Sequence, residues 1–238
     1  MRYSNPSQRR LWPRSEVSKD DKAALIPATF DLTRFRGDAT IPVYRASEAM
    51  GYLREEPLDE ANFPLFAEIK NQFGFIPNFF RSQTIRTDLI EAEDLLAHAI
   101  LVKQGALTRQ QKEYVFLVCS AANLSTYCVT AHCEMVRMLG VEGPEPEQIA
   151  VDHTSANIPM PLKALLNFAK KLNSQPTKVN QQDIDALRTF GYADEQILET
   201  VVLVGLAKFS NYVAFGLGTL PDFDSIKIEE KLAATLSR

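Results

Sequence analysis

Apolar residues recur every three or four positions along most of the chain from residue 63 onward, which is the spacing of one face of an α-helix. Gly74, Gly105 and Gly140 follow three of these runs, as glycine often does at the end of a helix. Alternating patterns typical of β-strands are nearly absent, so we predict an all-α fold. The expected helices cover residues 63–73, 88–103, 109–122, 125–140, 161–172, 181–189, 194–217 and 225–236.

The helix expected over residues 109–122 has the clearest start signal. Thr108 and Gln111 have the spacing of a capping box, and residues 114–122 are nearly all apolar. A helix that is apolar on all sides is expected to be deeply buried. A break follows at residues 123–124, and Ser125 then has the residue type and position of an N-cap for the next helix.

Residues 1–59 differ from the rest of the chain because they show no sustained helical period. We predict that they form an extended N-terminal arm, with a short helix over residues 46–54, which wraps its own core or reaches a neighbouring subunit. Residues 60–238 are predicted to form one all-α domain. Within that domain, residues 75–78 read as an apolar connector and residues 143–146 as a linker, since proline restricts the residue before it.

Two apolar segments resemble each other. Residues 113–121 align with residues 199–207 at an offset of 86, with a glutamate at the start of each. Duplication of a helical unit would produce this match. Two buried helices that share a Val/Leu-rich composition by chance would produce it equally well.

Composition narrows the possible partners. The chain has 238 residues, a formal net charge of −4 and a pI of about 5.5, which argues against nucleic acid and anionic membrane surfaces. The longest strongly apolar stretch, 201–207, is far shorter than the roughly 20 residues of a membrane span. The N-terminus has no apolar signal region, and three clustered cysteines do not resemble a secreted disulfide framework. We therefore expect a cytoplasmic protein.

Ser125, Cys128 and His132 fall on one face of the helix that starts at residue 125. Cys128 would lie in the first turn, where free N–H groups and the helix dipole favour a thiolate, so we expect its pKa to be lowered. His132 follows one turn later, and an imidazole beside a thiol can accept its proton. The alternative is a packed cysteine and a histidine with one satisfied hydrogen bond.

Glu113 lies in the apolar helix that precedes this stripe. A carboxylate in such surroundings is expected to have a raised pKa and to need a partner. The face that carries Cys128 and His132 is the nearest candidate.

These residues resemble the signature of the alkylhydroperoxidase D-like, or carboxymuconolactone decarboxylase-like, superfamily. That signature is Glu-x11-Cys-x2-Cys-x3-His followed by a glycine, and here Glu113, Cys128, His132 and Gly140 match it. Ser125 replaces the first cysteine. The segments at residues 73–78 and 187–199 resemble the peroxidase-related branch, and the resemblance extends over about residues 60–220.

The resemblance implies an all-α fold with an internal helical repeat, assembled into homo-oligomers and needing no cofactor. In peroxidase members, the cysteine that matches Cys128 attacks the peroxide and the cysteine at the position of Ser125 resolves it as a disulfide. The residues that match Glu113 and His132 relay protons.

Ser125 cannot form that disulfide. Cys133 is five residues from Cys128, which on one helix means a rise of about 7.5 Å and a rotation of about 140°, out of bridging range. The distance to Cys119 cannot be read from the sequence. Oxidation of Cys128 by peroxide would therefore give a sulfenic acid that an external thiol, or Cys119, must reduce.

Three hypotheses follow. The first is a one-cysteine thiol peroxidase in which Cys128 is the nucleophile, His132 and Glu113 handle protons and Ser125 donates a hydrogen bond. The second is a cysteine-independent, decarboxylase-like enzyme in which His132 and Glu113 perform acid–base chemistry on a small carboxylate. The third is a non-catalytic oligomer with a degenerate site.

The surroundings of Cys128 add two expectations. No metal site is expected, because Cys133 points away from Cys128 on the helix, so that Cys128, His132 and Cys133 do not converge, and no fourth ligand is evident. The aromatic residues Phe75, Phe79, Phe80 and Tyr127 are candidates for an apolar substrate entry, and core packing explains the phenylalanines equally well. Such an entry would favour a hydrophobic hydroperoxide over hydrogen peroxide.

Overall fold

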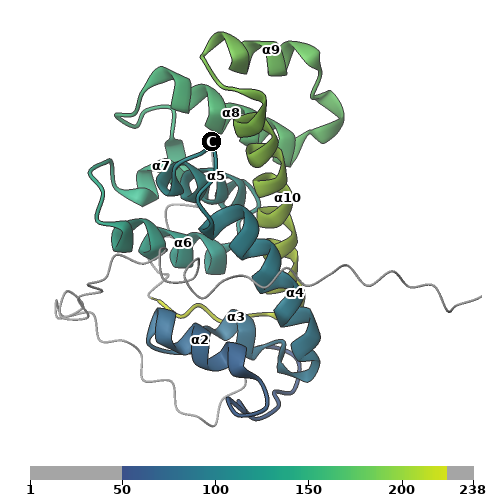
Figure 1. Cartoon of the computed structure of the whole chain (residues 1–238). Coiled ribbons are helices and arrows are strands. Elements are labelled where there is room, and N and C mark those ends of the chain that lie inside the picture. The colour runs from purple at the N-terminus through teal and green to yellow at the C-terminus, as the bar shows by residue number, and fades with distance from the viewer. Residues whose placement is uncertain (1–49, 224–238) are drawn as a thin grey trace, which may run out of the picture. The chain divides into compact units, whose positions relative to one another are not determined.

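A computed structural model describes residues 50–223, and in this range every regular element is helical, which confirms the predicted all-α class. Figure 1 shows how the helices are arranged. The α-helices are α2 (Pro64–Phe73), α3 (Asn78–Arg81), α4 (Thr87–Ala97), α5 (Arg109–Ala122), α6 (Thr126–Leu139), α7 (Pro146–Asp152), α8 (Met160–Ser174), α9 (Gln181–Thr189) and α10 (Asp194–Leu217). Shorter turns are the 3-10 helices η2 (Thr84–Arg86) and η4 (Pro176–Lys178) and the π-helix η3 (His98–Val102).

Most expected helices are present close to their expected bounds, and the exceptions have local causes. The segment 88–103 is not one α-helix, because α4 gives way to the π-helix η3. Residues 143–146 were predicted as a linker, but Pro146 is the first residue of α7, a position that suits proline. Residues 75–78 were predicted as a connector, and the last of them already begins α3.

Some expectations concern residues at the two ends of the chain. The helix predicted over 46–54 is wrong in its described part, since residues 50–54 form bends without helix. Residues 1–49 of the predicted arm and the helix predicted over 225–236 lie outside the described range. All described residues belong to one compact unit, Thr40–Arg238. The domain boundary at residue 59 stays a prediction.

Helix α5 is the centre of the main hydrophobic core. It packs against α6, α7, α8 and α10 (Figure 1), and ten consecutive residues, 112–121, are buried. The predicted capping box is present at its start: the Gln111 amide donates to Thr108 Oγ1 at 3.2 Å, and the Thr108 amide donates to Gln111 Oε1 at 2.9 Å. The cap fixes the start of α5, and burial on all sides fixes its orientation.

The turn between α5 and α6 positions the start of α6. Leu124 adopts a left-handed conformation with φ of 60°, which a non-glycine residue rarely does. The Ser125 amide then donates to the Ser120 carbonyl at 2.9 Å, which ties the new helix to the end of the old one. Ser125 occupies the predicted N-cap position, but its side chain makes no capping hydrogen bond.

A smaller hydrophobic cluster lies under α2, α3 and α4. Its buried members are Phe63, Phe66, Ile69, Ile76 and Ile90. Hydrogen bonds join it to the segment after α10: the Asn78 amide donates to Asp222 Oδ1 at 2.9 Å, and Asn78 Nδ2 donates to the Leu220 carbonyl at 3.0 Å.

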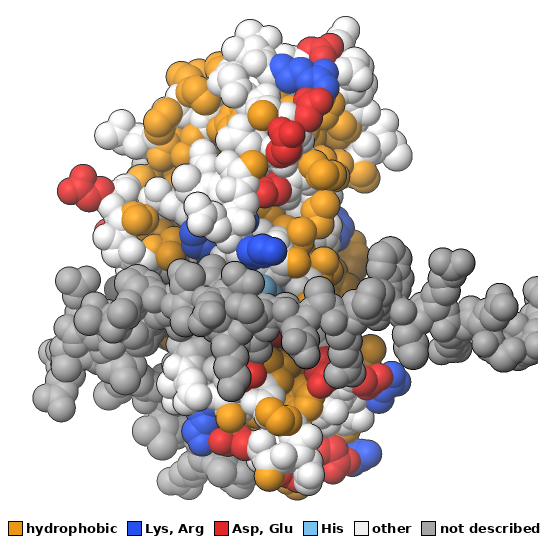
Figure 2. All heavy atoms as spheres, in the orientation of Figure 1, with side chains coloured by type: hydrophobic (Ala, Val, Ile, Leu, Met, Phe, Trp, Pro, Cys, Tyr) orange, Lys and Arg blue, Asp and Glu red, His pale blue; other side chains and the backbone are white. Residues whose placement is uncertain are grey.

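Within residues 50–223, α10 is long and apolar enough to cross a membrane by length and composition alone. Core helices of soluble proteins meet the same test, and one side of α10 packs against α5 and α8. Its other side exposes Leu198, Val201, Phe209, Tyr212 and Phe215. Figure 2 shows apolar side chains along the edge where α10 lies. The absence of a membrane partner stays a prediction.

Candidate active site

Glu113 and His132 meet between α5 and α6, as the sequence motif predicts. His132 Nδ1 lies 2.6 Å from Glu113 Oε2, and the Arg109 guanidinium lies 2.6 Å from Glu113 Oε1. The imidazole stacks on the Phe116 ring, with centroids 3.7 Å apart and an interplanar angle of 19°. Glu113 is fully buried, whereas the His132 side chain keeps 14% of its surface exposed. The carboxylate of this cluster is therefore enclosed, and the imidazole is partly open to solvent.

The pKa of Glu113 is lowered, which corrects the predicted rise. Burial acts to raise this pKa, but the charges and hydrogen bonds of His132 and Arg109 together outweigh burial. An ionised carboxylate only accepts hydrogen bonds, so His132 Nδ1 carries the proton in this contact. In the neutral imidazole, Nε2 is then the basic nitrogen.

Arg109 belongs to this cluster, although it is not among the site residues predicted from the sequence. It lies four residues before Glu113 on α5, a spacing that places the two side chains on the same helix face. This spacing is the feature of the sequence that could have identified Arg109 as a partner of Glu113. Arg109 contacts the carboxylate oxygen that His132 does not contact, and it adds to the effect of His132 in lowering the pKa of Glu113.

Cys128 lies in the first turn of α6 as expected, but its pKa is raised to about 11, which corrects the predicted lowering. Burial is the main cause, since only 3% of the residue is exposed, and the nearby polar side chains of Ser125 and Asn211 offset part of this rise in pKa. The helix dipole is too weak to overcome burial without a neighbouring cation. The imidazole of His132 is turned toward Glu113, and no Cys128–His132 hydrogen bond is formed in this part of the chain.

The hydroxyl of Ser125 is an unsatisfied buried group. The residue is 1% exposed, and Oγ has no hydrogen-bond partner of regular geometry among residues 50–223. It nevertheless lies close enough to Cys128 to favour the thiolate. A buried hydroxyl without a partner is uncommon and calls for an explanation.

The other two cysteines are buried thiols. Burial raises the pKa of Cys119 to about 12, and its Sγ lies 3.8 Å from the Ala169 carbonyl oxygen. Cys133 is buried on α6, and all three cysteines are free. Residues 50–223 contain no group of three or more His, Cys, Asp or Glu that could hold a metal ion. The expectation of no metal and no cofactor stays a prediction.

The predicted substrate-entry aromatics separate into two places. Phe79 and Tyr127 stack with centroids 6.0 Å apart, and the Tyr127 hydroxyl donates to Asp222 Oδ2 at 2.6 Å while accepting from the Phe79 amide at 3.1 Å. Phe75 instead packs edge-on against Phe223, 6.0 Å away. Phe79 and Tyr127 therefore lie together beside the start of α6, whereas the ring contact of Phe75 is with Phe223. The role of all three in substrate binding stays a prediction.

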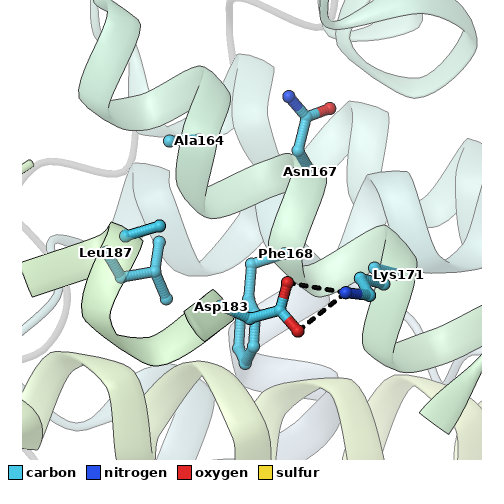
Figure 3. Close-up of a pocket in the computed structure, with 7 residues that line it drawn as sticks. Ala164, Asn167, Phe168, Lys171, Asp183 and Leu187 are labelled. Atoms are coloured by element: carbon cyan, nitrogen blue, oxygen red, sulfur yellow. Dashed lines mark hydrogen bonds and ion pairs between the residues drawn. The ribbon is translucent and has the colours of Figure 1, made fainter. Parts of the chain in front are cut away.

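One cavity, of about 250 Å³, lies away from these residues. It is formed between α8 and α9, where Lys171 binds Asp183 at 2.6 Å (Figure 3). The lining residues are Ala164, Asn167, Phe168, Lys171, Asp183, Ala186 and Leu187. None of the predicted site residues contributes to it.

Comparison with known proteins identifies solved structures with the same fold. No protein-family model matches the chain, and no curated protein matches it. The AhpD-core structure of an uncharacterised peroxidase-related protein from Ralstonia eutropha JMP134 is 29% identical, with a TM-score of 0.69, covering 74% of this chain and 94% of that one.

Two further structures have the same fold at lower identity. A peroxidase-related protein from Silicibacter sp. TM1040 is 19% identical with a TM-score of 0.68, covering 79% of this chain and 99% of that one. A variant of the debrominase Bmp8 in complex with 2,3,4-tribromopyrrole is 21% identical with a TM-score of 0.62, covering 80% and 98%. The AhpD-core structure and the motif residues on α5 and α6 confirm the resemblance to the AhpD-like, carboxymuconolactone decarboxylase-like superfamily, and the other two structures share its all-α fold.

Proposed function

We propose that this protein is a thiol-dependent, peroxidase-like oxidoreductase with Cys128 as its one reactive cysteine. The observation that supports this most is the 2.6 Å contact between His132 Nδ1 and Glu113 Oε2. It leaves the second imidazole nitrogen as a base, one helical turn after Cys128. A nucleophile, a base and a residue that orients the base are thus present on two adjacent helices.

The raised pKa of Cys128 defines what the base must do. With a pKa of about 11, the resting thiol is protonated at neutral pH. His132 Nε2 accepts the thiol proton as the reaction begins, and Glu113 stabilises the resulting imidazolium. Arg109 keeps Glu113 ionised throughout.

The proposed step is a displacement at oxygen. The Cys128 thiolate attacks one oxygen of a peroxide, the S–O bond forms as the O–O bond breaks, and the alcohol leaves with the proton from His132. Cys128 becomes a sulfenic acid. One external thiol then forms a mixed disulfide and releases water, and a second thiol restores the Cys128 thiol and leaves as a disulfide. Ser125 replaces the residue that would otherwise resolve the sulfenic acid internally.

The surroundings of the site support a proposal for the substrate and for the assembly. We propose that the substrate is a small hydrophobic hydroperoxide that approaches along the Phe79 ring. The Tyr127 hydroxyl beside this ring already donates to Asp222, so it offers no free donor to a polar substrate. The exposed apolar residues of α10 favour a homo-oligomer in which a second copy covers them. Three free thiols suit a cytoplasmic protein.

A second candidate is acid–base chemistry without cysteine. It is favoured by the burial of Cys128 beside a fully assembled Arg109–Glu113–His132 cluster. In this case His132 Nε2 would act directly on a small carboxylate, and Cys128 would only pack.

The test is a peroxide reaction followed by mass spectrometry. The reduced protein is mixed with stoichiometric cumene hydroperoxide or hydrogen peroxide in the presence of a sulfenic-acid trap. We expect a rapid adduct on Cys128, faster with cumene hydroperoxide, and none on Cys119. His132→Ala should slow the adduct by about a hundredfold, the usual size of a lost general base.

Cys119→Ser is the matched control, since it removes a buried thiol outside the site and should leave the adduct on Cys128 unchanged. Equal, slow labelling of all three cysteines would contradict the peroxidase proposal. Turnover of a carboxylate substrate by Cys128→Ser, lost in His132→Ala, would then establish the acid–base alternative. No turnover in either assay would leave the non-catalytic oligomer.

A further inference from the structure

The guanidinium group of Arg109 uses only one of its edges on Glu113. Nε donates to Glu113 Oε1 at 2.6 Å, and Nη2 lies 2.6 Å from the same oxygen atom. These two nitrogen atoms form the side edge of a planar group that carries five N–H groups in a fixed fork geometry. The end edge, which Nη1 and Nη2 form together, keeps two parallel N–H groups that Glu113 does not use. Such a fork matches the two oxygen atoms of a carboxylate.

The free fork has no partner in the described part of the chain. Between residues 50 and 223, the hydrogen bonds and ion pairs of the Arg109 side chain are all with Glu113. The Arg109 side chain keeps 27% of its surface exposed, whereas the Glu113 carboxylate is fully enclosed. Since the side edge faces this enclosed carboxylate, the end edge is directed away from it. Neutralising Glu113 requires the side edge alone, so the fork can hold a second anion.

The fork lies beside the proposed base. Glu113 offers Oε1 to Arg109 and Oε2 to His132, whose Nδ1 lies 2.6 Å from Oε2. Both side chains thus contact one carboxylate group, and both are partly exposed, with 14% of the His132 side chain open. A ligand that the fork holds would therefore lie next to the imidazole. Arg109 is also the first residue of α5, where the helix dipole favours an anion.

The donor set fits a carboxylate better than a phosphate. A phosphate monoester carries about two negative charges at neutral pH, and Arg109 brings one positive charge that Glu113 already offsets in part. The lysine of α5, Lys112, does not add a second charge to the fork, because its Nζ is enclosed and donates to the Lys103 carbonyl at 2.8 Å. The Phe116 ring, stacked on the imidazole, supplies an apolar surface rather than a donor. A ligand with one carboxylate and an apolar body suits these groups.

We propose that Arg109 is a substrate-binding residue and that the substrate is a hydroperoxide with one carboxylate group on an apolar body. Nη1 and Nη2 bind the carboxylate, and the hydroperoxide group extends along α6 toward Cys128, one helical turn before His132. The inference rests on the proposed function and narrows its substrate class. Carboxylate binding at Arg109 also suits acid–base chemistry by His132, so carboxylate binding and the reaction of Cys128 are measured separately.

The first experiment compares two peroxides that differ in charge. The reduced protein reacts at neutral pH with para-carboxycumene hydroperoxide or with its methyl ester, and the trapped sulfenic acid on Cys128 is quantified by mass spectrometry. We expect the acid to react about tenfold faster than the ester, as for a hydrogen bond between charged groups. Arg109→Gln should abolish this difference. Arg109→Lys should give an intermediate ratio of the two rates, because it keeps the charge without the planar fork.

Arg137→Gln is the matched control, because Arg137 lies on α6 and pairs with Glu134 and Glu147 instead. It should leave the ratio of the two rates unchanged. A structural role of Arg109, limited to holding Glu113, would make Arg109→Gln slow both peroxides equally and would leave their ratio as in the wild type. The ratio therefore separates substrate binding from the positioning of Glu113.

The second experiment measures binding without peroxide. Cys128→Ser is titrated with benzoate or with benzyl alcohol, which has a similar shape and no charge, and the NMR signals of the His132 ring are followed. Benzoate should shift these signals, and benzyl alcohol should not. Arg109→Gln in the same background should weaken benzoate binding about tenfold.

Equal rates with the two peroxides in the wild type would overturn the inference, and so would an unchanged ratio in folded Arg109→Gln. If that variant does not fold, an unchanged ratio in Arg109→Lys overturns it instead. Failure of both peroxides to label Cys128 while benzoate still binds through Arg109 would reject the proposed function and keep the carboxylate site. Labelling of Cys128 by both peroxides alike, with no benzoate binding, would reject the carboxylate site and keep the proposed function.

Discussion

His132 Nδ1 and Glu113 Oε2 lie 2.6 Å apart, and this contact joins α6 to α5 through a charge-assisted hydrogen bond in the protein interior. Arg109 completes the arrangement from the far side of the carboxylate. The same contact determines which nitrogen of His132 is basic. It also determines how much free energy of unfolding the folded state gains when Glu113 is ionised. It therefore connects the chemistry of the site to the pH dependence of stability.

Glu113→Gln tests that connection. The pKa of Glu113 is lowered on folding, so its contribution to stability is present above its ordinary value of 4.5 and is lost as the pH falls through the lower folded value. We expect the variant to be less stable by about 2 kcal/mol at about pH 7. The difference should shrink below about pH 4.5, which urea unfolding at several pH values would measure. Glu91→Gln, at an exposed position on α4, is the control, and a pH-independent loss in Glu113→Gln would contradict the argument.

Ser125→Cys should restore the two-cysteine motif of the family. The new thiol would lie at the N-cap of α6, three residues before Cys128 and on the same face. After stoichiometric peroxide, we expect a disulfide between this thiol and Cys128, and loss of the trapped sulfenic acid. Thiol titration and peptide mass spectrometry measure both.

Thr126→Cys is the matched control for this restoration. Its thiol would be two residues from Cys128, a spacing that does not bring side chains together on a helix. We expect no disulfide in this variant and a sulfenic-acid adduct as in the wild type. If the sulfenic-acid adduct on Cys128 persisted in Ser125→Cys, the serine at position 125 would not be the reason why Cys128 reacts without a resolving cysteine.

The features that the sequence predicts correctly are those that depend on residues close together along the chain. The start of α5 follows from Thr108 and Gln111, and the approach of His132 to Glu113 follows from the spacing of the family motif. The predicted directions of two pKa shifts, a rise for Glu113 and a fall for Cys128, were both wrong. Each shift depends on residues that come close only when the chain folds. Arg109 and His132 together lower the pKa of Glu113, and burial raises that of Cys128.

Tyr127→Phe tests whether Tyr127 is structural. Its hydroxyl donates to Asp222 and accepts from the Phe79 amide, and Asp222 is largely buried. Removing the hydroxyl leaves a buried carboxyl with one donor fewer, so we expect a loss of about 1–3 kcal/mol in unfolding free energy. Tyr212→Phe, at an exposed position on α10, should change stability little. A loss of activity without a loss of stability in Tyr127→Phe would instead give the hydroxyl a role toward substrate.

Two glycine-to-alanine variants should shift stability in opposite directions. At Gly105, an added Cβ would clash with Glu199 Oε1, which accepts a hydrogen bond from the Ala106 amide at 2.7 Å. Glu199 Oε2 accepts from the Leu107 amide at 2.9 Å, so the methyl group would displace a carboxylate that holds the whole turn before α5. We expect Gly105→Ala to lower the free energy of unfolding by about 1–3 kcal/mol through these lost hydrogen bonds.

Gly205 is the matched position inside α10. An added Cβ there meets no atom within 4 Å, and alanine favours a helix interior over glycine by about 1 kcal/mol. Gly205→Ala should therefore raise the free energy of unfolding, as measured by chemical denaturation of both variants beside the wild type. Because Gly205 lies on the exposed side of α10, a concentration-dependent loss of stability in this variant would instead locate a contact with a second copy at that helix. If Gly205→Ala lowered the free energy of unfolding as much as Gly105→Ala at every protein concentration, displacement of Glu199 would not explain the loss in Gly105→Ala.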